Sequence, residues 1–436
     1  MLKLDSKQKD FRAQLARFCE ETARNPEVAK TVSEIIADVR RGGDVTVSQY
    51  TAKFDGARLN ARQMRISPEA LEKAAAALPA PARKAFDEAA RNIRDYHKQT
   101  LPKSWEARNA HGARVGETFH PIRRCGLYIP GGQVPLASTV FMSALPAQLA
   151  GVPQIVACTP PRPDGSVDAS ILAALRFCGV SEVYAVGGVQ AIALMAYGTE
   201  TVPAVDKIFG PGNAYVCEAK RQVFGDVGVD LLPGPSEVAI IADATANPQW
   251  TAASLLAQAE HGTGGEKIYL IATDAPSLPD AVWQAMQVQL VSLSHAEKIR
   301  RVLDRNYCVL SLSGLQAAVE AANFIAPEHL EIHTSEKDAQ KYARQITTAG
   351  AMFIGHHTPT VLGDFTAGPS HTLPTGRTGR FFSGLQVTDF MRRTSLVEYS
   401  PESLKKAAAV VAAFTEMEKL DAHGRSLSIR LEGGVR

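Results

Sequence analysis

The chain has 436 residues, of which 45% are hydrophobic and 21% are charged. This length suits two to three domains, and the composition is that of a globular protein with a large core. Its 47 basic side chains nearly balance 45 acidic ones without forming a basic block, so neither nucleic acid nor a membrane surface is an expected partner. The polar start MLKLDSKQKDF is unlike a secretory signal, and no apolar stretch is long enough to span a bilayer. We therefore expect a cytoplasmic protein.

The first hundred residues show helical periodicity, chiefly in 26–40 and 67–96. From about Arg124, short apolar runs that end in Gly or Pro alternate with helical stretches, which predicts α/β architecture with largely parallel sheets. Two such blocks, about 126–236 and 237–380, predict two sheets, and the segment from about Ser383 returns to helix. The strand candidates are 154–158, 182–186, 207–209, 229–232, 238–242, 267–272 and 351–354.

Glycine-rich turns follow several predicted strands, but the dinucleotide pattern G-x-G-x-x-G is absent. GPGNAY at 210–215 has two of the three glycines, and GTGGEK at 262–267 follows a helix. Taken alone, this absence counts against a dehydrogenase. GPGN is still the best candidate for contact with a pyrophosphate, because its glycines let backbone amides approach closely.

A possible metal site begins with the segment 247–262, where Asn247 can cap a helix and Gly262 can follow its end. Gln258 and His261 share one face in the last turn and could hold a metal jointly. Alternatively, His261 only interacts with the helix C-terminus. The six scattered cysteines include no C-x-x-C pair, so metal ligands are expected to be nitrogen and oxygen atoms.

Adjacent acid and imidazole side chains occur in APEHLE at 326–331, where Pro327 predicts a helix start. Glu328 and His329 could transfer protons there, since both groups can titrate near neutral pH. The alternative is that Glu328 is only a favourable acid in a first helical turn.

Two further segments carry candidate residues. The Gly/Pro-rich loop 363–376 contains Asp364 and His371 and is either a site loop or an ordinary connection. The segment 400–424 predicts a helix that Gly424 ends, with Glu418 and His423 near that end. Here the alternative is that His423 interacts with the terminal carbonyls.

In this order, the segments resemble the histidinol dehydrogenase family over nearly the whole chain. The resemblance implies two incomplete Rossmann-like domains, which accounts for the missing glycine pattern. It divides the chain into an N-terminal helical arm (1–25), a first α/β domain (26–125 and 237–380), a second α/β domain (126–236) and a C-terminal helical dimerisation tail (381–436). The matching segments are GLYIPGG, VGGVQAIALMAYGTETVPAVDKIFGPGN, KRQVFG, GPSEV, LLAQAEHG, APEHLE, GDFTAGPSHTLPTG and the E-x-x-x-x-H from Glu418 to His423.

The resemblance also implies site residues. One zinc ion would be held by Gln258, His261, Asp364 and His423, and protons would be moved by Glu328 and His329. Besides the zinc ligands and His329, the substrate contacts would be Ser236, His371 and Glu418. The NAD contacts would be Tyr128, Gln190 and Asn213. Family members are homodimers in which the tail completes the neighbour's site, so Glu418 and His423 would act in trans.

The implied reaction is a two-step oxidation of L-histidinol through histidinal to L-histidine, a part of histidine biosynthesis, with two NAD consumed. Zinc would position and polarise the substrate through its imidazole and amino nitrogens. His329 would remove the hydroxyl proton, and Glu328 would activate the water that attacks the retained aldehyde.

Three positions depart from the family pattern: Phe365 stands where Tyr is common, and Ser370 and Ser143 stand where Asn is common. None is an implied metal ligand or proton-transfer residue, so they concern the substrate. They leave open another polar alcohol, such as sulfopropanediol. A zinc hydrolase, with Glu328 activating a zinc-bound water, is the alternative from a different class.

Overall fold

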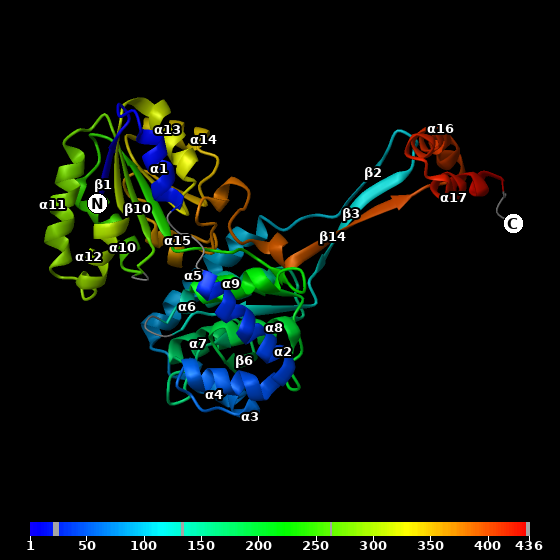
Figure 1. Ribbon diagram of the computed structural model, residues 1–436, viewed down its shortest axis with the longest axis horizontal. Helices are drawn as coiled ribbons and strands as arrows, with labels where there is room; N and C mark the ends of the chain where they lie inside the picture. Colours follow the sequence, from blue (N-terminus) through cyan, green and yellow to red (C-terminus); the bar gives the residue numbers. More distant parts are fainter. Residues whose placement is uncertain (21–25, 132–134, 262–263, 433–436) are drawn as a thin grey trace.

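The computed structural model describes residues 1–20, 26–131, 135–261 and 264–432, so the turn glycines Gly132 and Gly262 lie outside it. Two parallel sheets form two lobes, and a long arm projects away from them (Figure 1). This architecture confirms the predicted α/β class with parallel sheets. In the described part of the chain, no helix is long and apolar enough to cross a membrane.

The first lobe is built on a six-stranded parallel sheet of order β1-β11-β10-β9-β12-β13. The central strand β9 reads EVAIIA and is buried along its whole length, as expected for a parallel sheet covered on both faces. Helices α1, α13 and α14 cover one face, and α10, α11 and α12 cover the other. The elements are β1 (Leu2–Asp5), α1 (Phe11–Glu20), β9 (Glu237–Ala242), α10 (Pro248–Ala259), β10 (Lys267–Thr273), α11 (Leu278–Leu290), α12 (Ala296–Asn306), β11 (Tyr307–Leu312), α13 (Gly314–Ile325), β12 (His329–His333), α14 (Glu336–Gln345), β13 (Ala351–Ile354) and α15 (Val361–Phe365).

The second lobe contains a five-stranded parallel sheet of order β6-β5-β4-β7-β8. If β1 is set aside, the two sheets have the same strand order. In each, the strand that comes first in sequence lies in the centre, and the later strands are added first on one side of it and then on the other. The elements are α2 (Pro26–Phe54), α3 (Ala61–Met64), α4 (Pro68–Ala76), α5 (Ala80–Lys98), β4 (Arg124–Tyr128), α6 (Ala137–Leu149), β5 (Gln154–Thr159), α7 (Ala169–Phe177), β6 (Glu182–Ala185), α8 (Gly188–Tyr197), β7 (Lys207–Phe209), α9 (Ala214–Val223) and β8 (Gly228–Val229).

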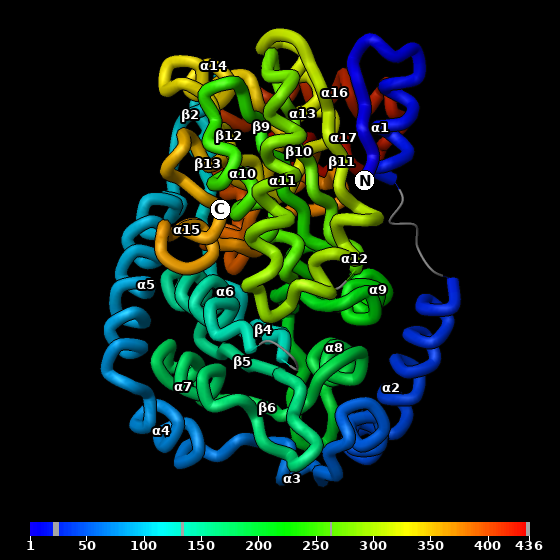
Figure 2. Tube along the Cα trace, turned by 90° about the vertical axis from the view of Figure 1, so that its left-hand side faces the viewer, coloured from blue at the N-terminus to red at the C-terminus, as the bar shows by residue number. Residues whose placement is uncertain are grey.

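The packing of the N-terminal third differs from the predicted division. Helices α2 to α5 bury their apolar faces against the five-stranded sheet, around which they wrap in Figure 2, although 26–125 was assigned with 237–380. Helical periodicity identifies a buried face but not the sheet that it covers. Residues 2–5, inside the predicted helical arm, form strand β1, which pairs with β11.

The prediction that the chain is helical from Ser383 onward is wrong in part, because a strand of the projecting arm precedes the helices. The arm consists of an antiparallel sheet of order β14-β3-β2 with two helices at its tip (Figure 1). The helix predicted over 400–424 ends early, because Lys419 adopts the left-handed conformation with φ of 55°. Gly424 therefore lies within a second helix and does not follow a helix end. The elements are β2 (Trp105–Arg108), β3 (Arg114–Pro121), β14 (Met391–Glu398), α16 (Pro401–Glu418) and α17 (Asp421–Glu432).

Candidate active site

Most residues predicted for chemistry gather at the amino ends of strands β9 and β12. Ser236 directly precedes β9, and His329 is the first residue of β12. The prediction of a helix start at Pro327 is wrong: α13 ends at Ile325, and the chain then enters β12, which pairs with β9 and β13. The residues that meet at this edge are Ser236, Gln258, His261, Glu328, His329, Asp364 and His371.

The imidazole of His329 is held in one orientation and one tautomer. Its Nδ1 lies 3.1 Å from the carbonyl oxygen of Glu237, which can only accept, so Nδ1 carries the hydrogen. Nε2 is buried without a hydrogen-bond partner, 3.9 Å from Oδ1 of Asp364. Burial lowers the pKa of His329 to about 3, which keeps the ring neutral at pH 7. Nε2 therefore carries a lone pair that is available to accept a proton.

The carboxyl group of Glu328 lies beside this imidazole in an equally buried position. Its Oε2 accepts a hydrogen bond from the backbone N–H of Glu237 at 2.9 Å and lies 3.6 Å from Nδ1 of His329. Burial holds the pKa of Glu328 well above its usual range, and the charges of Glu237 and Asp364 add to the effect. This carboxyl group can thus exchange protons at a higher pH than an ordinary glutamate.

An amide, an imidazole and a carboxylate provide possible metal ligands at the same edge. Asn247 caps α10 as predicted, and at its other end Nε2 of Gln258 lies 3.4 Å from Nδ1 of His261. Burial raises the pKa of Asp364 to about 6, and the neighbouring His261 opposes that rise. Among the described residues, no three His, Cys, Asp or Glu side chains lie close enough to hold a metal. Gln258, His261 and Asp364 could hold one together, and oxygen and nitrogen donors suit zinc.

Two predicted site residues lie elsewhere. Glu418 is the last residue of α16, and His423 lies in the first turn of α17. Both helices stand at the tip of the arm, far from α15 and the sheet edge (Figure 1). Within one chain, therefore, neither side chain joins the site.

His371 connects the two lobes through its ring nitrogens. Nδ1 lies 3.2 Å from the carbonyl oxygen of Asp364, and Nε2 lies 3.3 Å from Oγ1 of Thr139 in α6. Burial lowers the pKa of His371 to about 4. Sequence reasoning missed both Thr139 and Glu237. The position of Glu237 directly after Ser236 in GPSEV was a usable signal, whereas Thr139 lies in an apolar helix that offers none.

The residues predicted to contact NAD lie at the carboxyl ends of strands in the five-stranded sheet. Tyr128 ends β4, and its hydroxyl accepts a hydrogen bond from the N–H of Gly188 at 3.1 Å. Gln190 lies in the first turn of α8, and Asn213 caps α9 by accepting the N–H groups of residues 215 and 216. The strand order reverses between β4 and β7, where open α/β sheets bind ligands.

The two serines that depart from the family pattern are neighbours across the lobes. Oγ of Ser370 donates to the carbonyl oxygen of Met142 at 3.3 Å, and Ser143 follows Met142 in α6. Oγ of Ser143 is buried without a hydrogen-bond partner. Phe365, in contrast, is 58% exposed. The serines thus alter the interior beside His371.

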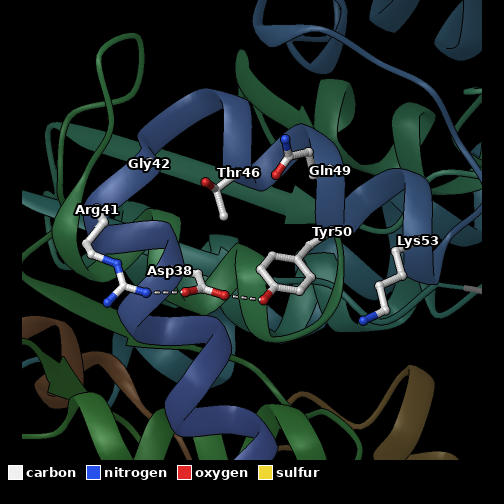
Figure 3. Close-up of a pocket in the computed structure, with 7 residues that line it drawn as sticks. All are labelled: Asp38, Arg41, Gly42, Thr46, Gln49, Tyr50 and Lys53. Atoms are coloured by element: carbon white, nitrogen blue, oxygen red, sulfur yellow. Dashed lines mark hydrogen bonds and ion pairs between the residues drawn. The ribbon is translucent and has the colours of Figure 1, made fainter.

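A separate surface cavity of about 400 Å³ lies where α2 kinks at Gly43. Figure 3 shows the carboxylate of Asp38 between Arg41 and Tyr50, which donate to it at 2.5 Å and 2.6 Å. These charged and polar groups therefore have partners within the cavity wall. No predicted site residue lines this cavity, so we assign it no part in the chemistry.

Comparisons with known proteins agree on one family. The family model for histidinol dehydrogenase matches residues 19–431. The chain is 43% identical to histidinol dehydrogenase of Geobacillus kaustophilus, with 94% of this chain and 95% of that protein covered. It is 44% identical to that of Rhizobium meliloti, with 94% and 93% covered. The crystal structure of histidinol dehydrogenase from Elizabethkingia anophelis matches with a TM-score of 0.92 at 32% identity, covering 99% of this chain and 98% of that one.

Proposed function

The chain belongs to the histidinol dehydrogenase family, and we propose that it oxidises L-histidinol to L-histidine with NAD and one zinc ion. Within that family, the observation that supports this best is the buried, neutral His329, whose unpartnered Nε2 lies beside Asp364, one of the side chains that could hold a metal. Membership of a dehydrogenase family favours this reaction over hydrolysis by a zinc-bound water. We expect the enzyme to serve histidine biosynthesis in the cytoplasm.

In this proposal, zinc is held by Gln258, His261 and Asp364 together with His423 of the partner subunit. Nitrogen and oxygen donors of this kind suit zinc, and an amide among them leaves the site less negatively charged than a carboxylate would. Bound zinc supplies a positive charge that orients and polarises the substrate. Ser236 and His371, at the same edge, would contact the substrate.

His329 and Glu328 divide the proton transfers. Nε2 of His329 removes the proton of the substrate hydroxyl, and the bond from Nδ1 to the carbonyl oxygen of Glu237 stabilises the imidazolium that results. Glu328 takes a proton from the water that attacks the aldehyde in the second step. Each transfer of this kind typically accelerates a reaction about 10²- to 10⁴-fold.

NAD is assigned to the carboxyl edge of the five-stranded sheet, where Tyr128, Gln190 and Asn213 lie. When bound, it supplies the hydride acceptor. The contact of Thr139 with His371 joins the lobe of these residues to the lobe that carries the proton-transfer pair. A cofactor at one edge can therefore meet a substrate at the other.

We also propose that the active form is a homodimer. The arm exposes large apolar side chains on both of its helices, including Phe414 at 55%, Met417 at 68% and Ile429 at 49%. An exposed apolar surface of this kind typically marks an association site. A second copy would cover it and supply Glu418 and His423 to the site.

A related substrate is the second candidate, because serines stand where the family commonly has two amides: Ser370 directly before His371, and Ser143 directly after Met142, whose carbonyl oxygen Ser370 contacts. Losing two amides changes the polar groups near the substrate without touching the proton-transfer pair. Another polar alcohol, such as sulfopropanediol, would then be the substrate.

Steady-state NADH formation with L-histidinol and with sulfopropanediol separates these functions. We expect L-histidinol to give the higher kcat/KM, activity to be lost after removal of the metal by a chelator, and zinc to restore it. Preference for sulfopropanediol would assign the second candidate. A rate unaffected by chelation would remove zinc from the proposal, and no NADH from either alcohol would contradict both.

A further inference from the structure

The loop between β7 and α9, residues 210–213, lacks the glycine pattern that usually shapes a dinucleotide-binding turn. Gly210, its first residue, has φ of +114°, and a Cβ there would come within 2.1 Å of the backbone oxygen of Tyr128. Only glycine therefore fits this position. The close approach brings the loop against Tyr128, but it does not explain what holds the flexible glycine in one conformation.

A buried ion pair holds both backbone polar groups of Gly210. Nζ of Lys220 donates to the carbonyl oxygen of Gly210 at 2.8 Å. Oδ2 of Asp230 accepts the N–H of Gly210, also at 2.8 Å. Lys220 and Asp230 bond directly to each other, and their side chains are 0% and 1% exposed. Asp230 follows β8 directly and also accepts the N–H of Leu231 at 2.6 Å, whereas Lys220 lies in α9, so the pair joins these two elements to the loop.

Stability alone is a weak reason for this arrangement. An ion pair removed from water loses hydration that its mutual attraction only partly replaces, and an apolar pair of similar size is often as stable. What an ion pair offers in addition is direction, because each charged group fixes the geometry of the groups bonded to it. Here both charged groups form hydrogen bonds to the backbone of a single loop residue, Gly210.

We propose that Lys220 and Asp230 are positioning residues for the dinucleotide: they fix Gly210 and thereby set the 210–213 loop before NAD binds. This inference rests on the proposed NAD site. A loop that is already ordered loses less conformational freedom on binding, which raises affinity without any new contact to the ligand. Sγ of Cys217 lies close to the same loop, 3.3 Å from the carbonyl oxygen of Gly212 and 2.7 Å from that of Pro233.

The test compares two neutralised ion pairs in the full-length protein. The double variant Lys220→Met/Asp230→Asn removes both charges, so that neither is left buried alone. The matched control is Arg124→Met/Glu182→Gln, which removes a pair with side chains 6% and 24% exposed at the opposite, amino edge of the same sheet. For each, we measure Kd for NAD⁺ by calorimetry, KM for NAD⁺ and for L-histidinol, kcat, zinc content and Tm.

We expect Kd and KM for NAD⁺ to rise about tenfold or more in the first variant, because the loop would then have to become ordered when NAD⁺ binds. The KM for L-histidinol, the zinc content and kcat at saturating NAD⁺ should stay close to the wild-type values. In the control, only Tm should fall. An NAD⁺ affinity that is unchanged in the first variant, or equally reduced in the control, overturns the inference while leaving the proposed function intact.

A wild-type protein that binds no NAD⁺ overturns the proposed function and this inference together. If Lys220→Met/Asp230→Asn does not fold, Asp230→Glu serves instead, because it keeps both charges and moves the carboxylate by one methylene. Hydrogen exchange of residues 209–214 is then measured beside NAD⁺ affinity. Faster exchange together with weaker NAD⁺ binding supports the positioning role of Lys220 and Asp230, and unchanged values of both contradict it.

Discussion

The two parallel sheets share one strand order but place candidate functional residues at opposite edges. In the five-stranded sheet, Tyr128 and Asn213 lie at the carboxyl ends of strands, where open α/β sheets usually bind ligands. In the six-stranded sheet, Glu328 and His329 lie at the amino end of β12. Strand order therefore does not decide which edge of a sheet carries a site, and the side chains at each edge must be considered separately.

The carboxyl edge of the six-stranded sheet is closed by a buried polar network. Nε2 of His333 lies 2.8 Å from Oε2 of Glu331, and Nδ1 lies 3.0 Å from Oγ1 of Thr251. Oε1 of Glu331 accepts the N–H and the hydroxyl of Thr360, at 2.7 Å and 2.8 Å. Both ring nitrogens of His333 thus have close polar partners, whereas Nε2 of His329 at the amino edge has no hydrogen-bond partner. Of the two histidines at the ends of β12, His329 is therefore the one with a ring nitrogen free to take part in chemistry.

The largest expected effect is at the amino edge of the six-stranded sheet. His329→Asn removes the lone pair that accepts the substrate proton, so kcat with L-histidinol should fall about 10²- to 10⁴-fold. Affinity for NAD⁺, which we assign to the other sheet, should not change. Steady-state kinetics and calorimetry with NAD⁺ measure the two separately. A parallel loss of NAD⁺ affinity would contradict the division of labour between the sheets.

Mixed dimers test whether that amino edge is completed by a second copy. His261→Asn and His423→Asn should each be inactive as homodimers. If the arm acts in trans, a mixed dimer gathers both defects in one site and leaves the other whole. Random mixing then makes about half of the dimers mixed and leaves about a quarter of all sites intact.

The two variants are unfolded and refolded together, and NADH formation is assayed, with subunit exchange confirmed by mass spectrometry. Wild-type protein taken through the same steps is the control. Exchange without recovered activity would mean that Glu418 and His423 do not serve the neighbouring site.

The smallest effects come from a pair of buried threonines, Thr139 and Thr251, each bonded to a histidine. Thr139 contacts His371 at the proposed substrate site, and Thr251 contacts His333 in the closed network. Thr139→Val should raise KM for L-histidinol about 2- to 10-fold, the equivalent of one hydrogen bond. Thr251→Val should lower the free energy of unfolding by about 1 kcal/mol and leave KM unchanged. Equal effects on KM would mean that the two edges do not differ as described.

Local signals predicted the elements that depend on neighbouring residues. Asn247 and Pro248 mark the start of α10, and the structure begins the helix there. Six of the seven strand candidates likewise fall on strands, because short apolar runs between turns need no distant partner to be recognised, whereas the candidate 229–232 shares only Val229 with β8. The family resemblance supplied the grouping of site residues, which spacing alone left open.

Long-range pairing explains the elements that were missed. Pro327 suggested a helix, but β9 and β13, distant in sequence, pair with the residues that follow and draw them into β12. Strand β14 carries charged residues on exposed positions and depends on its pairing with β3. Lys419 ends α16 in a left-handed conformation without the glycine that would signal it. Propensity and periodicity contain no information about such partners.

Strand β1 has a consequence for the order in which the chain assembles during its synthesis. Among the strands that the structure describes, Leu2–Asp5 pair only with β11, so roughly 300 residues must be translated before this strand finds its neighbour. All strands of the five-stranded sheet, and the helices α2 to α9 that cover it, lie between these two partners in sequence. A ribosome-bound chain can therefore complete the five-stranded lobe first, while the residues of β1 are still unpaired. The six-stranded lobe closes later around a segment that was translated long before its partner strand.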